Sequence, residues 1–382
     1  MDSIKSVFYN FFEENPVIAV ASPGRINLIG EHTDYNDGFV LPAAIDKRVE
    51  IAISHRNDKK ISLFSNDFNE EFTIDISEIQ PQKDFFWSNY ILGVVQQLVE
   101  KNIDIPGFNI ALQGNVPIGG GLSSSAALEC VVVFALNEWL QLGLDKMEMI
   151  FIAQKAEHDF AGVQCGIMDQ FASMFGKNNQ VMMLDCRTMD FQYFPLDLQQ
   201  YEIVLFDTQV KHSLATSEYN TRRAECEKAI SLIQKKFPDI LNLRDVSLNQ
   251  IEECVKNLDE KAYKRAKFVV QENERVQLAT QDLLNGNLIE FGKKMYETHV
   301  GLSELYEVSC MELDTLVDLV KNNQSVIGAR LMGGGFGGCT INLIAHENTD
   351  DVIKVVSENY CKITGKTMKV YRVNIQNGTH LI

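Results

Sequence analysis

The stretch at residues 115–129, NVPIGGGLSSSAALE, contains three consecutive glycines and, after one further residue, three consecutive serines. Before it, residues 108–113 alternate between apolar and polar side chains, a pattern typical of a half-buried strand. After it, apolar residues recur at helical spacing from Leu128 to Trp139. The order predicts a strand, a glycine loop and a helix N-terminus, whose unpaired N–H groups and dipole favour an anion such as phosphate.

The same stretch also fits an ordinary capped helix that follows a flexible turn. It is not a P-loop, because no G-K-[ST] tripeptide follows the glycines. Residues 365–367 have that tripeptide, but Tyr360 stands where the first glycine of a P-loop should be. The kind of phosphate that could bind must therefore be decided from the rest of the chain.

Composition limits the possible partners. At 382 residues the chain is long enough for two domains that share an interface. Its 45% hydrophobic and 23% charged residues are ordinary for a soluble globular protein. The net charge of −17 and the lack of a Lys/Arg-rich run argue against a nucleic-acid partner.

The sequence also predicts a cytoplasmic protein that does not enter a membrane. The first residues lack the continuous apolar segment and cleavage site of a signal peptide. No window approaches the roughly 18 uninterrupted apolar residues that a membrane span requires. The eight cysteines form no C-x-x-C pair, which favours reduced thiols over disulfides or a zinc site.

A second informative stretch is residues 22–46, SPGRINLIGEHTDYNDGFVLPAAID, which has more polar groups than a core would tolerate unpaired. One interpretation is a polar loop with surface ion pairs. The other is a site that recognises many hydroxyls, as a sugar requires, since carboxylates accept, histidine can donate and asparagine does both. A transition-metal site is disfavoured, because H-E-x-x-H is absent and one histidine with two acids is a poor ligand set.

Two further carboxylates stand out. Glu157 falls on the apolar face of a helix that begins near Asp145, where it must either reach solvent or find a partner or an ion. Asp169 falls in a short break before another apolar helix, and on residue type alone it is more often a helix N-cap.

Residues 333–338, GGGFGG, contain G-x-G-x-x-G. A dinucleotide-binding fold needs a helix directly after this motif, but residues 340–344 alternate as a strand. The loop is therefore predicted to join two strands. Earlier in the chain, residues 47–72 alternate well enough for a hairpin that turns at residues 57–58.

These motifs carry a resemblance to a known family. Residues 24–35, GRINLIGEHTDY, match the galactokinase signature position for position. Residues 117–129 resemble the second, ATP-binding motif of the wider superfamily of galactokinase, homoserine kinase, mevalonate kinase and phosphomevalonate kinase. Residues 328–344, GARLMGGGFGGCTINLI, resemble its third motif, with Met332 where many galactokinases have threonine. The motifs lie in family order across essentially the whole chain.

The resemblance implies an α+β fold of two domains, residues 1–190 and 191–382, with the active site in the cleft between them. It implies transfer of the ATP γ-phosphoryl group to the C1 hydroxyl of α-D-galactose in the Leloir pathway. We expect small-molecule partners only, with ATP and Mg²⁺ as cofactors, and a monomer.

The resemblance also implies roles for individual residues. The pattern C-G-x-M-D-Q at residues 165–170 makes Asp169 the catalytic base, and Arg25 is the second catalytic residue. The segment VKHSLATSEYNTRRAECEKAI at residues 210–230 resembles the one that carries a sugar-contacting tyrosine. The expected sugar contacts are Glu31, His32, Thr33, Asp34, Asp169 and Tyr219. The expected ATP contacts are Ser65, Gly119, Gly120, Gly121, Leu122, Ser123, Ser124 and Ser125, and the expected Mg²⁺ ligands are Ser125 and Glu157.

Two rival functions remain open on the sequence. One is a kinase for a related sugar such as N-acetylgalactosamine, against which the unbroken GEHTDY segment argues. The other is a regulator that senses galactose and ATP without turnover. Such paralogues lose residues in the second motif, whereas GLSSSAA is complete in this chain.

Overall fold

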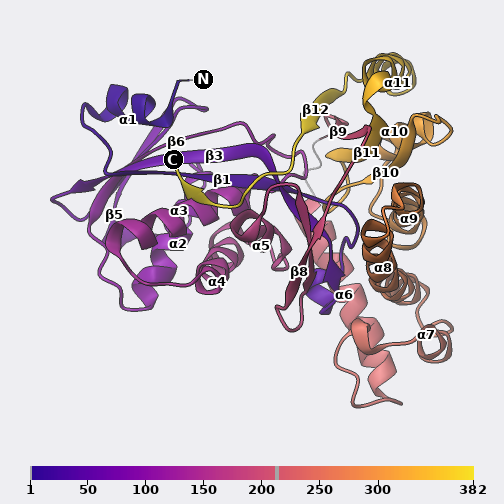
Figure 1. Cartoon of the computed structure of the whole chain (residues 1–382). Coiled ribbons are helices and arrows are strands. Elements are labelled where there is room, and N and C mark those ends of the chain that lie inside the picture. Colours follow the sequence, from indigo (N-terminus) through magenta and orange to yellow (C-terminus); the bar gives the residue numbers. More distant parts are fainter. Residues whose placement is uncertain (1, 211–214) are drawn as a thin grey trace.

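The first lobe is built on a six-stranded sheet in the order β13-β1-β3-β6-β4-β5 (Figure 1). The structure, a computed structural model, describes residues 2–210 and 215–382. The strands are β1 (Ile18–Asn27), β3 (Pro42–Arg56), β4 (Lys60–Ser65), β5 (Glu70–Asp75), β6 (Gly107–Gly114) and β13 (His380–Leu381). One face of the sheet is covered by α2 (Ser88–Glu100), α3 (Ser124–Leu140), α4 (Lys146–Ala156) and α5 (Met168–Phe175). The other face carries α1 (Ile4–Phe12), which has its own small apolar cluster.

The central strand of this sheet corrects the predicted hairpin at residues 47–72. β3 pairs with β1 and β6, whereas β4 pairs with β6 and β5, so β6 lies between the two strands that we expected to pair. β6 is buried along nearly its whole length. A strand with two buried faces is best placed where it has a neighbour on each side.

Two local predictions in this lobe are confirmed. The stretch at residues 107–140 forms a strand, a glycine loop and a helix, as the pattern indicates. The helix predicted from Asp145 is α4, which begins with a capping box: the Asp145 side chain accepts from the Glu148 N–H at 2.8 Å, and Glu148 accepts from the Asp145 N–H at 2.9 Å.

The second lobe contains a four-stranded sheet in the order β10-β11-β9-β12. Its strands are β9 (Tyr201–Asp207), β10 (Val326–Leu331), β11 (Cys339–Ala345) and β12 (Lys369–Val373). Its helices are α6 (Ala215–Gln234), α7 (Leu248–Cys254), α8 (Glu260–Leu284), α9 (Leu288–Val300), α10 (Met311–Val320) and α11 (Thr349–Thr364). The GGGFGG segment joins β10 to β11, so the prediction that it connects two strands is confirmed.

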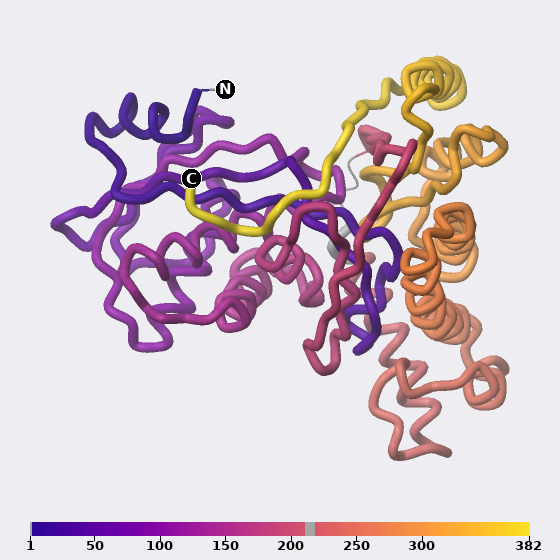
Figure 2. The backbone as a smooth tube through the Cα atoms, viewed as in Figure 1, coloured from indigo at the N-terminus to yellow at the C-terminus, as the bar shows by residue number. Residues whose placement is uncertain are grey.

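A third, three-stranded sheet lies between the lobes, with β7 (Gln180–Asp185) between β2 (Phe39–Val40) and β8 (Phe191–Pro195). The C-terminal segment then runs from the second lobe back to the first, where β13 pairs with β1 (Figure 2). The α+β class with two lobes is confirmed. The division at residues 190 and 191 stays a prediction. Two strands after residue 190 pair with strands before it: β8 pairs with β7, and β13 pairs with β1.

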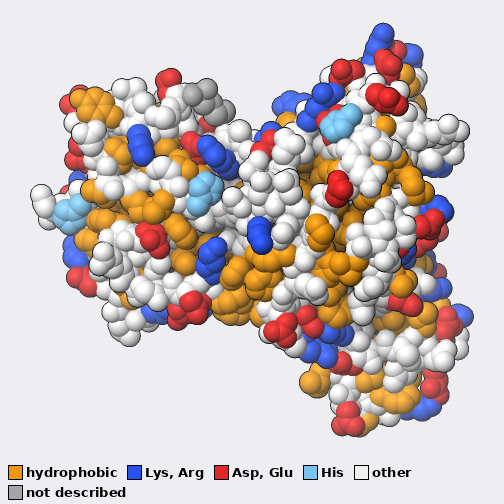
Figure 3. Space-filling model, viewed as in Figure 1, with side chains coloured by type: hydrophobic (Ala, Val, Ile, Leu, Met, Phe, Trp, Pro, Cys, Tyr) orange, Lys and Arg blue, Asp and Glu red, His pale blue; other side chains and the backbone are white. Residues whose placement is uncertain are grey.

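The surface facing the viewer in Figure 3 has acidic and basic side chains interspersed, with a notch between the two lobes. Among the described residues no helix has the length and apolar character needed to cross a membrane. The eight cysteines all lie in the described part of the chain and are all free, as the sequence predicts.

Candidate active site

Arg25 is fixed where strand β1 passes the glycine loop. β1 continues to its end through a bulge just before Arg25, so the polar-loop interpretation is wrong for this part of residues 22–46. A Cβ atom on Gly24 would lie 2.7 Å from the carbonyl oxygen of Leu122, and the same oxygen accepts from the Arg25 N–H at 3.0 Å. This close approach holds the buried Arg25 side chain beside the loop.

Asp169 faces Arg25 across the site. It is the second residue of α5, with Ile167 at the N-cap position, so the N-cap interpretation is wrong. Arg25 Nε donates to Asp169 Oδ1 and Nη2 donates to Oδ2, both at 2.7 Å, and Ser123 Oγ donates to Oδ2 at 2.6 Å. Burial lowers the pKa of Arg25, but the nearby Asp169 and Glu31 charges more than offset it and the net shift is upward. The pair is therefore a bidentate ion pair of fixed orientation.

The glycine loop has the backbone shape that its sequence predicts. Gly119 and Gly121 have φ angles of +76° and +74°, and Ser123 has φ +57° immediately before α3 begins. A Cβ atom on Gly121 would lie 3.0 Å from the carbonyl oxygen of Met332, so the two glycine-rich segments meet here. The Gly121 carbonyl oxygen also accepts from Arg25 Nη1. The N-terminus of α3 therefore lies beside the Arg25–Asp169 pair.

A cavity of about 170 Å³ opens beside this pair. It is lined by side chains from both lobes, including most of the predicted sugar and catalytic residues: Arg25, Glu31, His32, Asp34, Asp169 and Tyr219. Glu157 also lines the cavity. Residues as far apart in the chain as Arg25 and Gly334 therefore surround one volume.

Glu31 is held by a residue that the sequence did not single out. Arg330, which is fully buried in β10, donates from Nη1 and Nη2 to Glu31 Oε1, both at 3.1 Å. The Gly333 N–H donates to the same oxygen at 2.8 Å. These bonds all end on Oε1, and Glu31 is one of the residues that line the cavity.

Asp34 lines the cavity together with other acidic residues, including Glu31 and Asp169. Burial first, and then the negative charge of Asp169, raise its pKa to about 7. A Cβ atom on Gly166 would lie 1.8 Å from Asp34 Oδ2, so a larger residue at position 166 would displace the Asp34 carboxyl group. A sugar hydroxyl could therefore meet this group as a donor or as an acceptor, depending on pH.

His32 and Tyr219 form the aromatic side of the cavity, with ring centroids 5.4 Å apart. Burial lowers the pKa of His32 to about 3, so the ring is neutral at pH 7. Tyr219 lies in α6 and comes from the second lobe. Residues 211–214 of the segment that predicted Tyr219 lie outside the described residues.

Thr33, among the predicted sugar contacts, does not line the cavity, and neither does any of the predicted ATP contacts, Ser65 and residues 119–125. The Thr33 hydroxyl donates within its own loop, to the Gly30 and Phe39 carbonyl oxygens at 2.9 and 2.7 Å. Ser65 is buried at the end of β4, where its hydroxyl accepts from the Phe68 N–H at 3.4 Å. Their side chains have structural partners, and their proposed ligand contacts stay predictions.

Glu157 sits in a buried carboxylate network. Gln170 Nε2 donates to Glu157 Oε2 at 2.8 Å and to Glu129 Oε2 at 3.1 Å. Burial, and next the charge of Asp169, raise the pKa of Glu157 to about 7, although hydrogen bonding from Ser125 opposes this rise. The network has more carboxylates than cations, so a bound cation would reduce the repulsion between its negative charges. Its hard oxygen donors, Ser125 and Glu157, suit Mg²⁺.

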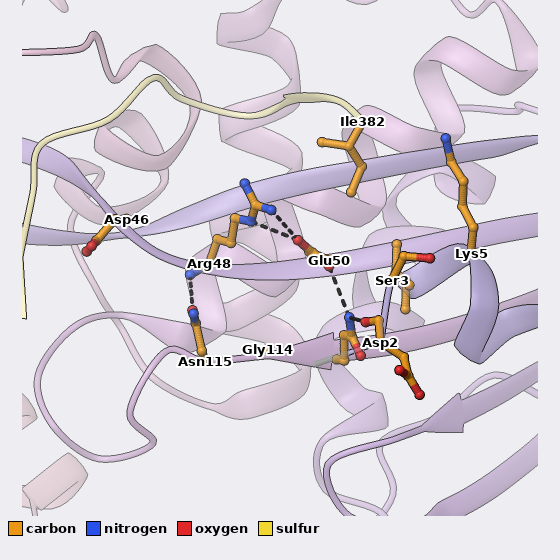
Figure 4. Close-up of a pocket in the computed structure, with 11 residues that line it drawn as sticks. Asp2, Ser3, Lys5, Asp46, Arg48, Glu50, Gly114, Asn115 and Ile382 are labelled. Carbon is orange, nitrogen blue, oxygen red and sulfur yellow. Dashed lines mark hydrogen bonds and ion pairs between the residues drawn. The ribbon is translucent and has the colours of Figure 1, made fainter.

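The structure also contains a larger cavity that is not this site. It measures about 560 Å³ and lies beside the two ends of the chain (Figure 4). Its polar groups pair with one another: Arg48 Nε donates to Glu50 Oε1 at 2.8 Å, and Gln113 Nε2 donates to Glu50 Oε2 at 3.1 Å. None of the predicted catalytic or sugar residues lines it.

Comparison with known proteins first defines the class. Residues 89–177 match the family model for the GHMP kinases N terminal domain, and residues 279–361 match the GHMP kinases C terminal model. A solved mevalonate kinase has the same fold, with a TM-score of 0.63 at 20% identity over 94% of this chain and 99% of that one. This protein is therefore a GHMP kinase by fold.

Comparison with more similar proteins identifies the family within this class. Residues 6–55 match the galactokinase galactose-binding signature. A galactokinase of Clostridium tetani is 42% identical over 385 aligned positions, 100% of this chain and 98% of that protein. A galactokinase of Thermotoga maritima is 39% identical over 363 positions, covering 95% of this chain and 99% of that protein. The crystal structure of Lactococcus lactis galactokinase complexed with galactose has a TM-score of 0.95 at 36% identity, covering 100% and 99% of the two chains. The chain belongs to the galactokinase family, and it is an ATP-dependent sugar kinase.

Proposed function

We propose that this protein transfers the γ-phosphoryl group of ATP to the C1 hydroxyl of α-D-galactose, giving galactose 1-phosphate and ADP in the Leloir pathway. The observation that supports the proposal is the Arg25–Asp169 pair, which lines a polar cavity next to the N-terminus of α3. Phosphoryl transfer depends mainly on positioning and charge stabilisation, and this arrangement supplies both.

The sugar would occupy the cavity of Glu31, His32, Asp34 and Tyr219, with Thr33 shaping the loop that carries three of them. A carboxylate oxygen and a neutral imidazole can together accept from and donate to neighbouring hydroxyls. An epimer that leaves such a buried group unpaired can be rejected by up to roughly 10⁴-fold. This preference would separate galactose from glucose.

Asp169 would accept the proton of the C1 hydroxyl as the sugar attacks the γ-phosphorus. Its bidentate partner Arg25 fixes the direction of the carboxylate and supports its ionised form. The same guanidinium would offset the charge that develops on the transferred group.

At the phosphate end, the backbone of residues 119–122 and the serines Ser123, Ser124 and Ser125 would hold the ATP phosphates at the start of α3. Ser65 would contact the nucleotide at the end of β4. Ser125 and Glu157 would hold Mg²⁺, which neutralises phosphate oxygens when it is bound. Glu157 must be ionised to do this, so binding of the cation should release a proton near neutral pH.

We also propose that residues 1–190 and 191–382 act as two domains, and that the protein is a cytoplasmic monomer without nucleic-acid or membrane partners. The interspersed surface charge and net charge of −17 support the absence of a nucleic-acid partner. The rival sensor function is not favoured, because the glycine loop and the Arg25–Asp169 pair are both complete.

A coupled ADP-release assay with galactose, glucose and N-acetylgalactosamine tests the proposal. Galactose should be the preferred substrate, and Asp169→Asn should lower kcat by about 10³-fold or more while calorimetry still detects galactose binding. The exposed Asp104→Asn is the matched control and should keep full turnover. Turnover with N-acetylgalactosamine alone, or substantial turnover by Asp169→Asn, would contradict the substrate or the base assignment respectively.

A further inference from the structure

A line of hydrogen bonds leads from the sugar cavity into the second lobe. His32 Nδ1 lies 2.7 Å from the Tyr35 hydroxyl, and that hydroxyl lies 2.8 Å from the Tyr306 hydroxyl. The Tyr306 hydroxyl in turn lies 3.2 Å from Cys226 Sγ. His32 and Tyr35 come from the first lobe, whereas the buried Tyr306 and Cys226 come from the second. We call Tyr35 and Tyr306 the hydroxyl relay.

The relay acts on a histidine that is neutral. Burial lowers the pKa of His32 to about 3, and the nearby Gly334 backbone only partly opposes this shift. A neutral imidazole carries one proton, so one ring nitrogen donates and the other accepts. Because Nδ1 is taken by Tyr35, Nε2 is the nitrogen left for a ligand. Within the described chain Nε2 is buried and makes no hydrogen bond of good geometry, although the Gly334 backbone interacts with the ring and both residues line the cavity.

The direction of the relay decides which nitrogen holds the proton. In one order, the Cys226 thiol donates to Tyr306, Tyr306 donates to Tyr35, and Tyr35 donates to His32 Nδ1. In the reverse order, the last phenolic O–H must donate to the Cys226 sulfur. Sulfur is weak both as a donor and as an acceptor, so it does not distinguish the two orders. The first order is favoured at the other end, because a phenolic O–H is an acidic donor and an unprotonated imidazole nitrogen is a good acceptor. Burial raises the pKa of Cys226 to about 12, which keeps its S–H proton in place.

Tyr306, the second-lobe member of the hydroxyl relay, is held in place by its neighbours. Arg222 donates from Nε to the Tyr306 carbonyl oxygen at 2.9 Å and from Nη2 to the Glu307 carbonyl oxygen at 2.7 Å. The Tyr306 ring packs on Phe268, with centroids 4.9 Å apart. Arg222 is therefore a buried residue that holds the backbone of Tyr306 in place. Tyr306 has little freedom to turn its hydroxyl away.

We propose that Tyr35 and Tyr306 are positioning residues that hold His32 with its proton on Nε2, so that the ring presents an N–H donor to one sugar oxygen. The inference rests on the proposed function, since the ligand in the cavity is taken to be the sugar. It makes sugar recognition in the first lobe depend on a hydroxyl supplied by the second. The sugar atom that would accept from the His32 Nε2–H is an oxygen with a free lone pair.

The tautomer can be read directly from long-range ¹H–¹⁵N spectra of the full chain with ¹⁵N-labelled histidine. Comparison with His32→Gln assigns the His32 signals among the seven histidines. We expect the wild type to show a protonated Nε2 and a bare Nδ1, and Tyr35→Phe to show a mixture. A wild-type ring with its proton on Nδ1 would overturn the proposal without any variant having to fold.

Kinetics supply the second readout. Tyr306→Phe keeps the ring but removes the hydroxyl, and we expect the KM for galactose to rise by about tenfold, the effect of one hydrogen bond, with the KM for ATP changed less than about twofold. Tyr360→Phe is the matched control, because its buried hydroxyl donates to the Thr208 carbonyl oxygen at 2.9 Å, away from the relay. Equal effects of the two variants on galactose KM would show a merely structural role and overturn the proposal.

A panel of monodeoxygalactoses identifies the oxygen involved. For one deoxy sugar, the one that lacks the oxygen facing His32, Tyr306→Phe should carry no further penalty relative to the wild type. A constant penalty across the panel would overturn the assignment. Failure of the proposed function would look different: galactose would not be phosphorylated at all, while the spectra would still report the His32 tautomer.

Discussion

The two ends of the site are built in opposite ways. The sugar end, residues 27–40, is held by buried side chains of the second lobe: Arg330 donates to the Leu28 carbonyl oxygen at 2.7 Å, and Glu272 accepts from the Gly30 N–H at 2.8 Å. The phosphate end, residues 115–125, has an open outer side, where Ile118 is 65% exposed and a Cβ atom on Gly119 would meet nothing within 4 Å.

The difference has a physical reason. A sugar is recognised by several hydroxyls at fixed positions, so its partners must be preorganised, and long-range buried bonds do this. Phosphate is held by backbone N–H groups and a helix dipole, which a short local sequence can supply alone. The sugar end should therefore be the more sensitive to changes in the second lobe.

The strongest test of this comparison is Arg330→Met. The change leaves the Glu31 carboxylate buried without its cation and removes the donors to the Leu28 and Leu331 carbonyl oxygens. Loss of one partner of a buried ion pair costs about 3–5 kcal/mol, so we expect that decrease in the free energy of unfolding. Urea titration followed by circular dichroism measures it.

Adding Glu31→Gln to Arg330→Met serves as the control. The double variant no longer buries an unpaired charge, so it should recover part of the lost stability. The single variant should raise the KM for galactose more than the KM for ATP, if enough folded protein remains. A loss below about 1 kcal/mol, or an ATP-specific defect, would show that the sugar end does not depend on Arg330 as the contacts suggest.

A second test uses the pH dependence of Asp34. Its pKa is about 7 in the folded protein, against about 3.9 in an unfolded chain. Between these values the folded state holds a proton that the unfolded state has released, so this group's contribution to stability falls as the pH rises. The difference in unfolding free energy between the wild type and Asp34→Asn should therefore decrease from about pH 4 to pH 7.

Urea unfolding of the ligand-free proteins at several pH values measures this difference. The same measurement in saturating galactose shows how the bound sugar changes it. If Asp34 binds sugar as a carboxylate, saturating galactose should shift the decrease to lower pH. A stability difference that instead rises with pH over this range would mean that Asp34 is ionised in the ligand-free protein, and that the burial argument is wrong.

The features of the fold that the sequence could predict are local, and those that it could not predict depend on long-range contacts. The strand, loop and helix at residues 107–140 and the strand-to-strand loop at residues 332–338 depend on local patterns, and both were predictable. The placement of β6 between β3 and β4 was not, because sequence order favours the pairing of neighbouring strands in a hairpin.

The candidate site divides in the same way. The glycine loop can be recognised from its own residues, but the partner of Asp169 lies 144 positions away and became visible only through the family resemblance. Arg330 lies 299 positions from Glu31 and had no signal beyond a charge inside an apolar strand. That signal, a buried cation that needs a partner, could have marked Arg330 as a candidate.

The smallest expected effect tests the phosphate end. Gly119→Ala places a Cβ atom in open space, so its only cost to folding is the strained φ of +76°, about 1 kcal/mol. Gly143→Ala is a matched control, since Gly143 has φ +72°, meets nothing within 4 Å and lies at the far end of α3. Both variants should lose the same stability in urea. Gly119→Ala alone should raise the KM for ATP, because a methyl group there would face the phosphates, and galactose KM should not change. If Gly119→Ala behaved as Gly143→Ala in every assay, the phosphates would not approach the loop at residue 119, and the ATP contact there would have to move toward Ser123 and the start of the helix.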